Sequence, residues 1–294
     1  MVTIGTFDGV HLGHRHIIDR LNDRAEEVGG ESVLLTFHPH PRSIVQPDAG
    51  VRLLSTMTER IQLLEEAGLQ HLIVFPFTLE FSRKSALEYV RDLLVNAIGV
   101  KYLVVGYDHH FGRNREGDID LLRDYAETFA FQVEEIAAQT LEEVNISSTK
   151  VRNAIKDGDV AAAERYLGYA YRLAGLVVEG EGRGRQLGFP TANVIPLSQE
   201  KLVPAVGVYA VEVLMQGESY PAMLNIGHKP TFHGEVEWPL GLEVHIIDWT
   251  GDIYGKELEI RFKERLRPET AFDSPDELKD QLAKDRLTVL RLFA

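Results

Sequence analysis

The stretch GTFDGVHLGH, at residues 5–14, is the most informative part of this 294-residue chain. It follows a short apolar segment, residues 2–4, and precedes apolar residues at helical spacing. A strand that enters a glycine-containing turn and then a helix is typical of a β/α unit, and the free N–H groups at the start of such a helix favour an anion. We therefore expect the helix to begin near Leu12 and to place His11 and His14 beside a phosphate.

The composition is that of a globular protein with room for two cores. The chain carries 44% hydrophobic residues and a formal charge of −14, from 45 acidic and 31 basic residues, without a run of Lys and Arg. This balance argues against nucleic acid as a partner. The lack of cysteine excludes disulfides and thiolate chemistry, and no secretory or membrane-spanning segment is visible. We expect a cytoplasmic enzyme for small molecules, with no membrane partner, and we predict no particular oligomeric state.

The first half alternates short apolar strands with helices. After the first strand, further strands are expected at residues 32–37, 71–75, 101–106 and 131–136, each preceded by a helical pattern. This rhythm predicts a doubly covered parallel sheet whose ligands lie beyond the carboxyl ends of the strands. The polar motifs TFHPHP and GYDHHFG follow two of these strands directly. One site is therefore expected to collect them together with the first motif.

The second half changes to strands interrupted by Gly and Pro, which predicts a small antiparallel barrel. The expected strands cover residues 173–180, 207–215, 220–227, 241–249 and 257–262, and a closing helix covers about residues 275–293. Two helices separated by a break at Gly158 connect the halves. The prediction is thus an α/β domain at residues 1–170 and a β-barrel domain at residues 171–294.

Two groups of polar residues in the first domain have the chemistry of a phosphate site. His11 and His14 are expected to donate hydrogen bonds to phosphate oxygens as charge builds at phosphorus, without a covalent intermediate. Surface histidines are an equal alternative, and zinc is a weaker one because the glutamate of a metalloprotease helix is missing. A second anion cradle, or a simple helix cap, is predicted from four residues, Ser147, Ser148, Thr149 and Arg152.

The barrel half contains a second unrelated motif, GRQLGFPTAN, at residues 184–193. Glycines in and before it permit N–H groups to approach a phosphate chain, and Thr191 and Asn193 add oxygen ligands that suit Mg²⁺. Without the PTAN residues, the glycines would indicate an ordinary turn. Glu243 alternates with apolar neighbours on a predicted strand, so it is either a solvated carboxylate or the base for a phosphoryl acceptor, supported by His245.

The motifs of the first half resemble the nucleotidyltransferase module of prokaryotic bifunctional FAD synthetases. The resemblance implies a Rossmann-like fold of the HxGH type, in which the phosphate of FMN attacks the α-phosphate of ATP to give FAD and pyrophosphate. His11 and His14 match the paired histidines of that family, and His38 and His109 depart from its pattern. It also implies substrate or nucleotide contacts from Gly5, Phe7, Asp8, Gly9, Asp108, Ser147, Ser148, Thr149 and Arg152.

The motifs of the second half, GRGRQLGFPTAN, PAVGVYAV, NIGHKPTF and LEVHIID, resemble the riboflavin kinase module of the same proteins. This resemblance implies that Thr191 and Asn193 hold Mg²⁺ and ATP phosphates. It also implies that Glu243 deprotonates the ribityl 5′-hydroxyl of riboflavin, which receives the γ-phosphate to give FMN. The further binding residues expected are Gly184, Arg185, Gly188, Pro190, Asn225 and Arg267.

The sequence therefore predicts an FAD-forming enzyme with both steps in one chain and with riboflavin, FMN, ATP and Mg²⁺ as its ligands. Two alternatives remain open at this point. One is a riboflavin kinase with a weakened or inactive adenylyltransferase domain. The other is a flavin- or nucleotide-binding protein without turnover, which the combination of Thr191, Asn193 and Glu243 disfavours because a binder needs no base.

Overall fold

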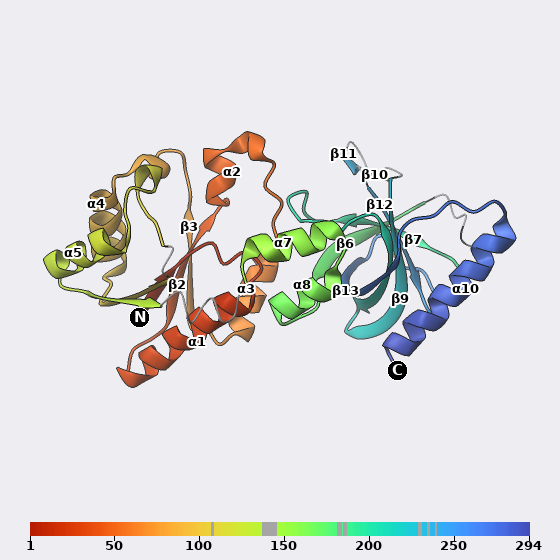
Figure 1. The fold of residues 1–294 in the computed structure, drawn as a ribbon, viewed down its shortest axis with the longest axis horizontal. Helices are drawn as coiled ribbons and strands as arrows, with labels where there is room; N and C mark the ends of the chain where they lie inside the picture. The colour runs from red at the N-terminus through yellow and green to blue at the C-terminus, as the bar shows by residue number, and fades with distance from the viewer. Residues whose placement is uncertain are drawn as a thin grey trace. The chain divides into compact units, whose positions relative to one another are not determined.

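The computed structural model of the chain describes residues 1–106, 109–136, 146–180, 184, 187–228, 231–233, 236–238 and 240–294. The chain forms two compact units, Met1–Ser148 and Thr149–Ala294, which are described separately below (Figure 1). The predicted class, a parallel α/β fold followed by an antiparallel barrel, is confirmed.

The first unit is built on a five-stranded parallel sheet with the strand order β3-β2-β1-β4-β5. Its strands are β1 (Val2–Ile4), β2 (Val33–His38), β3 (His71–Pro76), β4 (Tyr102–Gly106) and β5 (Gln132–Ile136). The order reverses at β1, so the turn that leaves β1 lies at the switch point where doubly wound sheets bind their ligands.

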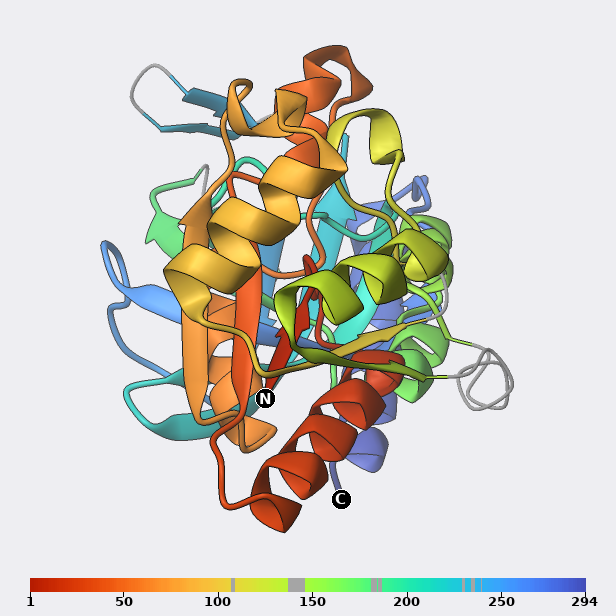
Figure 2. The same ribbon diagram turned by 90° about the vertical axis from the view of Figure 1, so that its left-hand side faces the viewer.

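Helices cover both faces of this sheet (Figure 2). Leu35 and Val105 belong to the core formed with α4, its π-helical continuation and α5, whereas Val104 packs with Leu21 of α1. The helices are α1 (Leu12–Glu27), α2 (Pro41–Val45), α3 (Met57–Glu66), α4 (Ala86–Glu88), the π-helix Tyr89–Ile98 and α5 (Ile119–Phe129). Short 3₁₀ turns cover Pro47–Ala49, Phe81–Arg83 and Arg113–Arg115. The alternation of side chains along the three central strands, β1, β2 and β4, thus buries both faces of the sheet.

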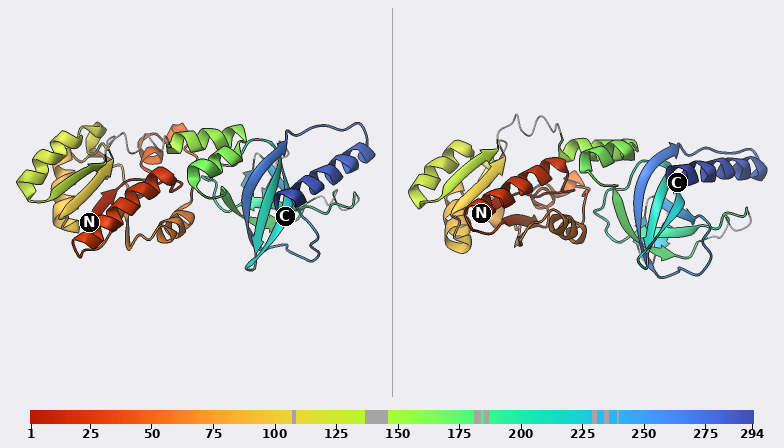
Figure 3. Two further views of the ribbon diagram at one scale, coloured as in Figure 1. Left: turned by 60° about the horizontal axis from the view of Figure 1, so that its bottom comes forward. Right: turned by 90° about the horizontal axis from the view of Figure 1, so that it is seen from below.

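The second unit contains a closed six-stranded barrel in the order β12-β7-β6-β13-β8-β9. The strands are β6 (Arg172–Val178), β7 (Ala192–Pro196), β8 (Gly207–Met215), β9 (Glu218–Gly227), β12 (Gly241–Ile246) and β13 (Glu257–Arg267), and β10 (Thr231–His233) pairs with β11 (Val236–Trp238). The helix α10 (Pro275–Leu292) packs through Val289 against Ala210 of β8 and Met223 of β9 (Figure 3).

Two features differ from the sequence prediction. Strand β7 was not among the predicted strands, because its residues Ala192 and Asn193 belong to a motif that we interpreted as a ligand-binding turn. The connecting helices α7 (Ser148–Asp157) and α8 (Val160–Leu167) break at Gly158 as expected, but the compact units divide before Thr149 rather than near residue 170. Residues 149–167 are therefore part of the second compact unit.

Candidate active sites

The turn after β1 is held in a strained conformation. Phe7, Gly9 and Val10 have φ angles of 46°, 83° and 36°, in the left-handed region that disfavours residues with a Cβ atom. Phe7 and Val10 are nevertheless buried. A turn of this kind persists only where the surrounding structure fixes it, and such turns cluster at functional sites.

His11 is the N-cap of α1, as the sequence predicted from the expected helix start near Leu12. Its Nδ1 atom accepts a hydrogen bond from the backbone N–H of His14, at 3.3 Å. An accepting Nδ1 places the proton of the neutral ring on Nε2, so this ring presents a donor on its other edge. The cap leaves Nε2 of the neutral ring as a donor, and its donation to a phosphate stays a prediction. Gly13 makes room for the ring, because a Cβ atom there would lie 3.2 Å from it.

His14 lies between two rings. Its imidazole stacks on His11 with ring centroids 3.7 Å apart and on Phe7 at 4.6 Å. Burial, together with the nearby His11 and Arg60, holds the pKa of His14 well below its ordinary value of 6.5, so the ring is neutral at pH 7. Its Nδ1 atom is buried and has no hydrogen-bond partner among the residues that the structure describes. A buried nitrogen at a helix N terminus is suited to a ligand oxygen.

Asp8 supports the turn from inside the protein. Its carboxylate accepts hydrogen bonds from the backbone N–H groups of Leu54 (3.0 Å) and Ser55 (2.9 Å) and from the Ser55 hydroxyl (3.2 Å). Arg60 of α3 lies 3.4 Å from the same carboxylate, and both side chains are only 2% exposed. These contacts give Asp8 a positioning role, whereas the sequence predicted direct contact with substrate. Nothing in the sequence motifs indicated Ser55 or Arg60.

The segment at residues 146–148 meets this turn, although the sequence predicted it only as a separate anion cradle or a helix cap. The Ser148 hydroxyl donates to the backbone carbonyl of Asp8, at 3.1 Å. The Ile146 carbonyl is 3.6 Å from the position of a Cβ atom on Gly13. Ser147 is exposed beside them, and Thr149 and Arg152 follow on α7.

Of the two remaining motifs of the first unit, TFHPHP is described in full and GYDHHFG in part. Asp108 lies outside the described residues, so its predicted contact stays a prediction. His109 stacks on Phe111 with ring centroids 5.9 Å apart, and His38 is exposed at the end of β2. His38 is the last residue of β2 and His109 comes shortly after β4, at the carboxyl ends of the strands where the topology predicts ligand contacts.

In the barrel, three polar residues form a row across neighbouring strands. Glu243 of β12 pairs directly with Asn193 of β7 on one side and with Asn225 of β9 on the other. Directly opposed residues in antiparallel strands place their side chains on the same face, with Cβ atoms about 5 Å apart. Leu242 and Val244 point to the buried face, so the row lies on the outer wall of the barrel.

The glycine-rich segment lies against this row. A Cβ atom on Gly180 would overlap the side-chain amide of Asn193, and one on Gly184 would lie 3.2 Å from the Thr191 hydroxyl. Thr191 and Asn193 are two residues apart, which puts both on the same side of an extended chain. Gly188 follows with a φ of 82°, and Arg185 lies outside the described residues. The backbone at Gly180 and Gly184 therefore lies close to Asn193 and Thr191, and the predicted approach of its N–H groups to a phosphate chain stays a prediction.

His245 fixes the start of the PTAN segment. Its Nδ1 atom lies 2.8 Å from the carbonyl oxygen of Pro190, and because a carbonyl only accepts, Nδ1 carries the proton. The ring also contacts Phe189 edge to face, with centroids 5.3 Å apart. Burial lowers the pKa of His245, which keeps the ring neutral at pH 7. His245 thus positions the turn that precedes Thr191.

Arg267 has a tethering role in this structure. Its guanidinium contacts Asp285 of α10 at 2.9 and 3.0 Å, and Asp285 also accepts from Gln281. These contacts join the end of β13 to α10, and a flavin contact by Arg267 stays a prediction. Glu269, two residues farther on, lies 2.5 Å from where a Cβ atom of Gly227 would be. No motif of the sequence indicates Glu269 or its place beside Asn225 and Gly227.

The donor set of the barrel row fits a hard divalent cation better than a soft one. Hydroxyl, amide and carboxylate oxygens are the ligands that such a cation prefers. Among the described residues, no group of three His, Cys, Asp or Glu side chains has the arrangement of a metal site. Mg²⁺ usually keeps part of its shell as water and takes further oxygens from the phosphates of a nucleotide.

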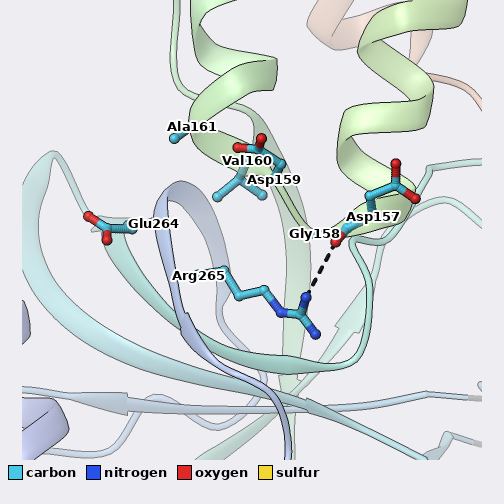
Figure 4. A pocket seen from close by; sticks show the side chains of 7 residues that line it. All are labelled: Asp157, Gly158, Asp159, Val160, Ala161, Glu264 and Arg265. Atoms are coloured by element: carbon cyan, nitrogen blue, oxygen red, sulfur yellow. Dashed lines mark hydrogen bonds between the residues drawn. The ribbon is translucent and has the colours of Figure 1, made fainter.

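A separate pocket of about 360 Å³ lies in the second unit, between the α7–α8 junction and β13 (Figure 4). Arg265 crosses it and donates to the carbonyl of Asp157 at 3.3 Å and to that of Val206 at 2.6 Å. Its described lining consists of Asp157, Gly158, Asp159, Val160, Ala161, Glu264 and Arg265. Glu243, Asn193 and Asn225 are not among these residues, so the pocket is distinct from the row around Glu243.

Each half of the chain matches the model of a known domain family. A family model described as FAD synthetase matches residues 1–150, and one described as riboflavin kinase matches residues 167–293. The first class covers the strained turn with His11 and His14, and the second covers the barrel with its polar row.

Full-length relatives combine the two domains. The chain is 39% identical over 296 residues to the bifunctional riboflavin kinase/FMN adenylyltransferase of Escherichia coli strain K12, covering 100% of this chain and 92% of the relative. It is 34% identical over 297 residues to the protein of the same name from Bacillus subtilis, with the same coverage of both chains. The chain therefore belongs to the bifunctional riboflavin kinase/FMN adenylyltransferase family.

A solved structure shares the whole fold. The crystal structure of a protein described as a macrolide-efflux protein from Streptococcus pneumoniae matches with a TM-score of 0.85 and 32% sequence identity, over 98% of this chain and 93% of that one. Within the described part of the present chain, no helix has the length and apolar character needed to cross a membrane.

The protein is thus an enzyme with two activities. It phosphorylates riboflavin to FMN and transfers the adenylyl group of ATP to FMN, and both reactions use ATP with a divalent metal. Of the three functions considered from the sequence, this is the first, an enzyme that carries out both steps of FAD formation. Riboflavin, FMN and ATP are its substrates.

Proposed function

We propose that adenylyl transfer takes place at the turn of residues 5–14, within the predicted domain 1–170. The observation that supports this assignment is the buried Nδ1 atom of His14 at the start of α1, which has no hydrogen-bond partner in the described part of the chain. In this step an oxygen of the FMN phosphate forms a bond to the α-phosphorus of ATP, and the bond to pyrophosphate breaks. His11 and His14 donate hydrogen bonds to oxygens that gain negative charge, and the charge of bound triphosphate raises the pKa of His14.

We propose that phosphorylation takes place on the outer wall of the barrel, within the predicted domain 171–294. The observation that supports it is the direct pairing of Glu243 with Asn193 and Asn225. Glu243 accepts the proton of the riboflavin 5′-hydroxyl as that oxygen forms a bond to the γ-phosphorus, and ADP leaves. Asn225 orients the flavin side chain beside it.

We propose Mg²⁺ as the cation of this reaction, held by the Thr191 hydroxyl and the Asn193 amide oxygen. When bound, the ion neutralises charge on the transferring phosphoryl group. Gly180 and Gly184 permit the approach of the backbone to these two side chains, and His245 fixes the turn before them. The polar face of the barrel therefore supplies binding, orientation and a base.

The assignments are tested by product analysis on the complete chain. The protein is incubated with riboflavin, ATP and Mg²⁺, and separately with FMN, ATP and Mg²⁺, and the flavins are resolved by chromatography. Both mixtures should yield FAD. Chelation should stop both reactions, and addition of Mg²⁺ should restore them. Restoration by another divalent ion and not by Mg²⁺ would contradict the choice of metal.

A further inference from the structure

Arg60 holds the strained turn of the first unit from a position outside every motif of the sequence. Its Nη2 atom donates to the carboxylate of Asp8 at 3.4 Å and to the carbonyl of Ser55 at 3.3 Å, and its Nε atom donates to the Ser55 hydroxyl at 3.4 Å. The Ser55 hydroxyl in turn accepts from the N–H of Gly9, at 2.9 Å. One buried guanidinium is thus connected to two consecutive residues of the turn.

The start of α3 fixes Arg60 in this place. Thr56 and Glu59 form a capping box, in which each side chain bonds the backbone N–H of the other at 3.2 and 2.8 Å. Arg60 follows directly in the first turn of the helix. Its guanidinium is therefore carried by a rigid element and is planar, so it can bond several acceptors in one fixed geometry.

Stability alone does not account for this arrangement. A buried ion pair contributes little net stability, because removal of both charges from water offsets their attraction. The turn it holds contains two residues other than glycine in the left-handed region, Phe7 and Val10. Strain of this kind is retained where a particular conformation serves function. A buried pair that selects one conformation of the turn is consistent with both observations.

The same guanidinium also acts on His14. Burial is the main cause of the lowered pKa of His14, and electrostatic interactions with His11 and with the Arg60 guanidinium lower it further. These are the two titratable or charged groups that shift the pKa of His14. His11 belongs to the same turn, and Arg60 belongs to α3. Arg60 is therefore connected to the histidines through the shape of the turn and through its charge.

We propose that Arg60 is a positioning residue for adenylyl transfer, which holds residues 8–11 so that His11 and His14 meet the phosphates. The inference rests on the proposed role of these two histidines. Arg60 does not touch the reacting atoms, so its loss should lower the rate of FAD formation through misplacement of groups that do. A misplacement of about 1 Å in such a group can reduce the rate about 100-fold.

The test replaces Arg60 in the complete chain and measures both activities. In Arg60→Met, kcat for FAD formation from FMN should fall about 100-fold, with a smaller change in KM. FMN formation from riboflavin should stay within about twofold, which reports an intact second unit. Arg20→Met is the matched control, because Arg20 makes a partly exposed ion pair with Glu134 in the same unit. Both activities of that variant should match the parent.

Two readouts separate positioning from a merely structural role. NMR titration of the histidines should show the pKa of His14 closer to 6.5 in Arg60→Met than in the parent. Arg60→Lys should recover part of the rate, to about tenfold below the parent, because an ammonium pairs with Asp8 but cannot make all the bonds to Ser55. Should Arg60→Met unfold the first unit, Arg60→Lys and Ser55→Ala carry the test, each with kcat for FAD formation lowered about tenfold in a folded protein.

The outcomes distinguish this inference from the proposed site. A folded Arg60→Met variant with parental kcat and an unchanged His14 titration would overturn the role of Arg60. The same holds for folded Arg60→Lys and Ser55→Ala variants at the parental rate. If His14→Ala also keeps the parental rate of FAD formation, the proposed site itself is wrong. If His14→Ala is inactive and Arg60→Met is not, only the inference about Arg60 fails.

Discussion

The two proposed sites are built in opposite ways. In the first unit, His11 and His14 follow a strained turn, and buried groups from elsewhere in that unit, Ser55 and Arg60, hold it. In the barrel, Asn193, Glu243 and Asn225 lie on regular strands, and the register of the sheet alone places them side by side.

This difference determines how each site responds to substitution. A site set by strand register depends mainly on its own side chains, because backbone hydrogen bonds along the strands hold the geometry. A site on a strained turn depends also on residues that never touch substrate. We therefore expect loss of function to be concentrated in the barrel row and spread over several elements in the first unit.

The largest effect is expected from Glu243→Gln. Loss of the proposed base should lower kcat for FMN formation about 1000-fold, whereas FAD formation from added FMN should stay at the parental rate. Chromatographic assay of both products from one protein preparation provides the measurement. Glu257→Gln, an exposed carboxylate on β13, is the matched control and should keep both activities. Equal loss of both activities in Glu243→Gln would contradict a role as base.

A pair of glycine variants should produce opposite defects. Gly180→Ala places a methyl group on the amide of Asn193, and Gly13→Ala places one against the His11 ring. Because each neighbour is the movable end of a side chain, it can shift to make room for the methyl group. We therefore expect the substitution to lower activity more than the free energy of unfolding. We expect Gly180→Ala to lower only FMN formation and Gly13→Ala only FAD formation, each about tenfold.

The control for both is Gly217→Ala, at a hairpin glycine with a φ of 85° and open space around it. It reports the cost of a strained backbone without displacement of a polar group. Steady-state kinetics with riboflavin and with FMN would compare the three proteins. The comparison fails if Gly13→Ala and Gly180→Ala each lower both activities to the same extent.

The sequence predicted the regular parts of the molecule and the barrel row better than the supports of the first site. The spacing of apolar residues predicted the helices and the parallel strands. The alternation of apolar and polar residues around Glu243 predicted that it lies on the face of the strand opposite to its apolar neighbours. Strand β7 was missed because PTAN was assigned to ligands alone. Arg60 was missed because Asp8, which it contacts, is far from it in the sequence and comes close only in the folded chain. In addition, no local sequence pattern distinguishes one buried arginine from the other charged residues of an amphipathic helix.

The smallest effect is expected on stability against acid. His14 is neutral in the folded protein because its pKa is lowered, so the unfolded chain binds one more proton as the pH falls below 6.5. The free energy of unfolding of the first unit should therefore decrease with falling pH there, by at most about 1.4 kcal/mol per pH unit from this group. Above that pH the contribution should be constant.

Denaturant unfolding at a series of pH values would measure this slope, with His14→Phe as the variant that removes the group and keeps a ring. His16→Phe, two residues along the same helix, is the control. A slope that is identical in the parent and in His14→Phe would contradict a buried neutral His14.

The central claim is that one chain carries two separate sites, one for each step, and complementation tests it most directly. Glu243→Gln and His14→Ala are incubated with riboflavin, ATP and Mg²⁺, each alone and then mixed. We predict that neither variant alone forms FAD, that His14→Ala accumulates FMN, and that the mixture forms FAD from FMN released into solution. FAD from either variant alone, or none from a mixture in which FMN has accumulated, would contradict the assignment of the two sites.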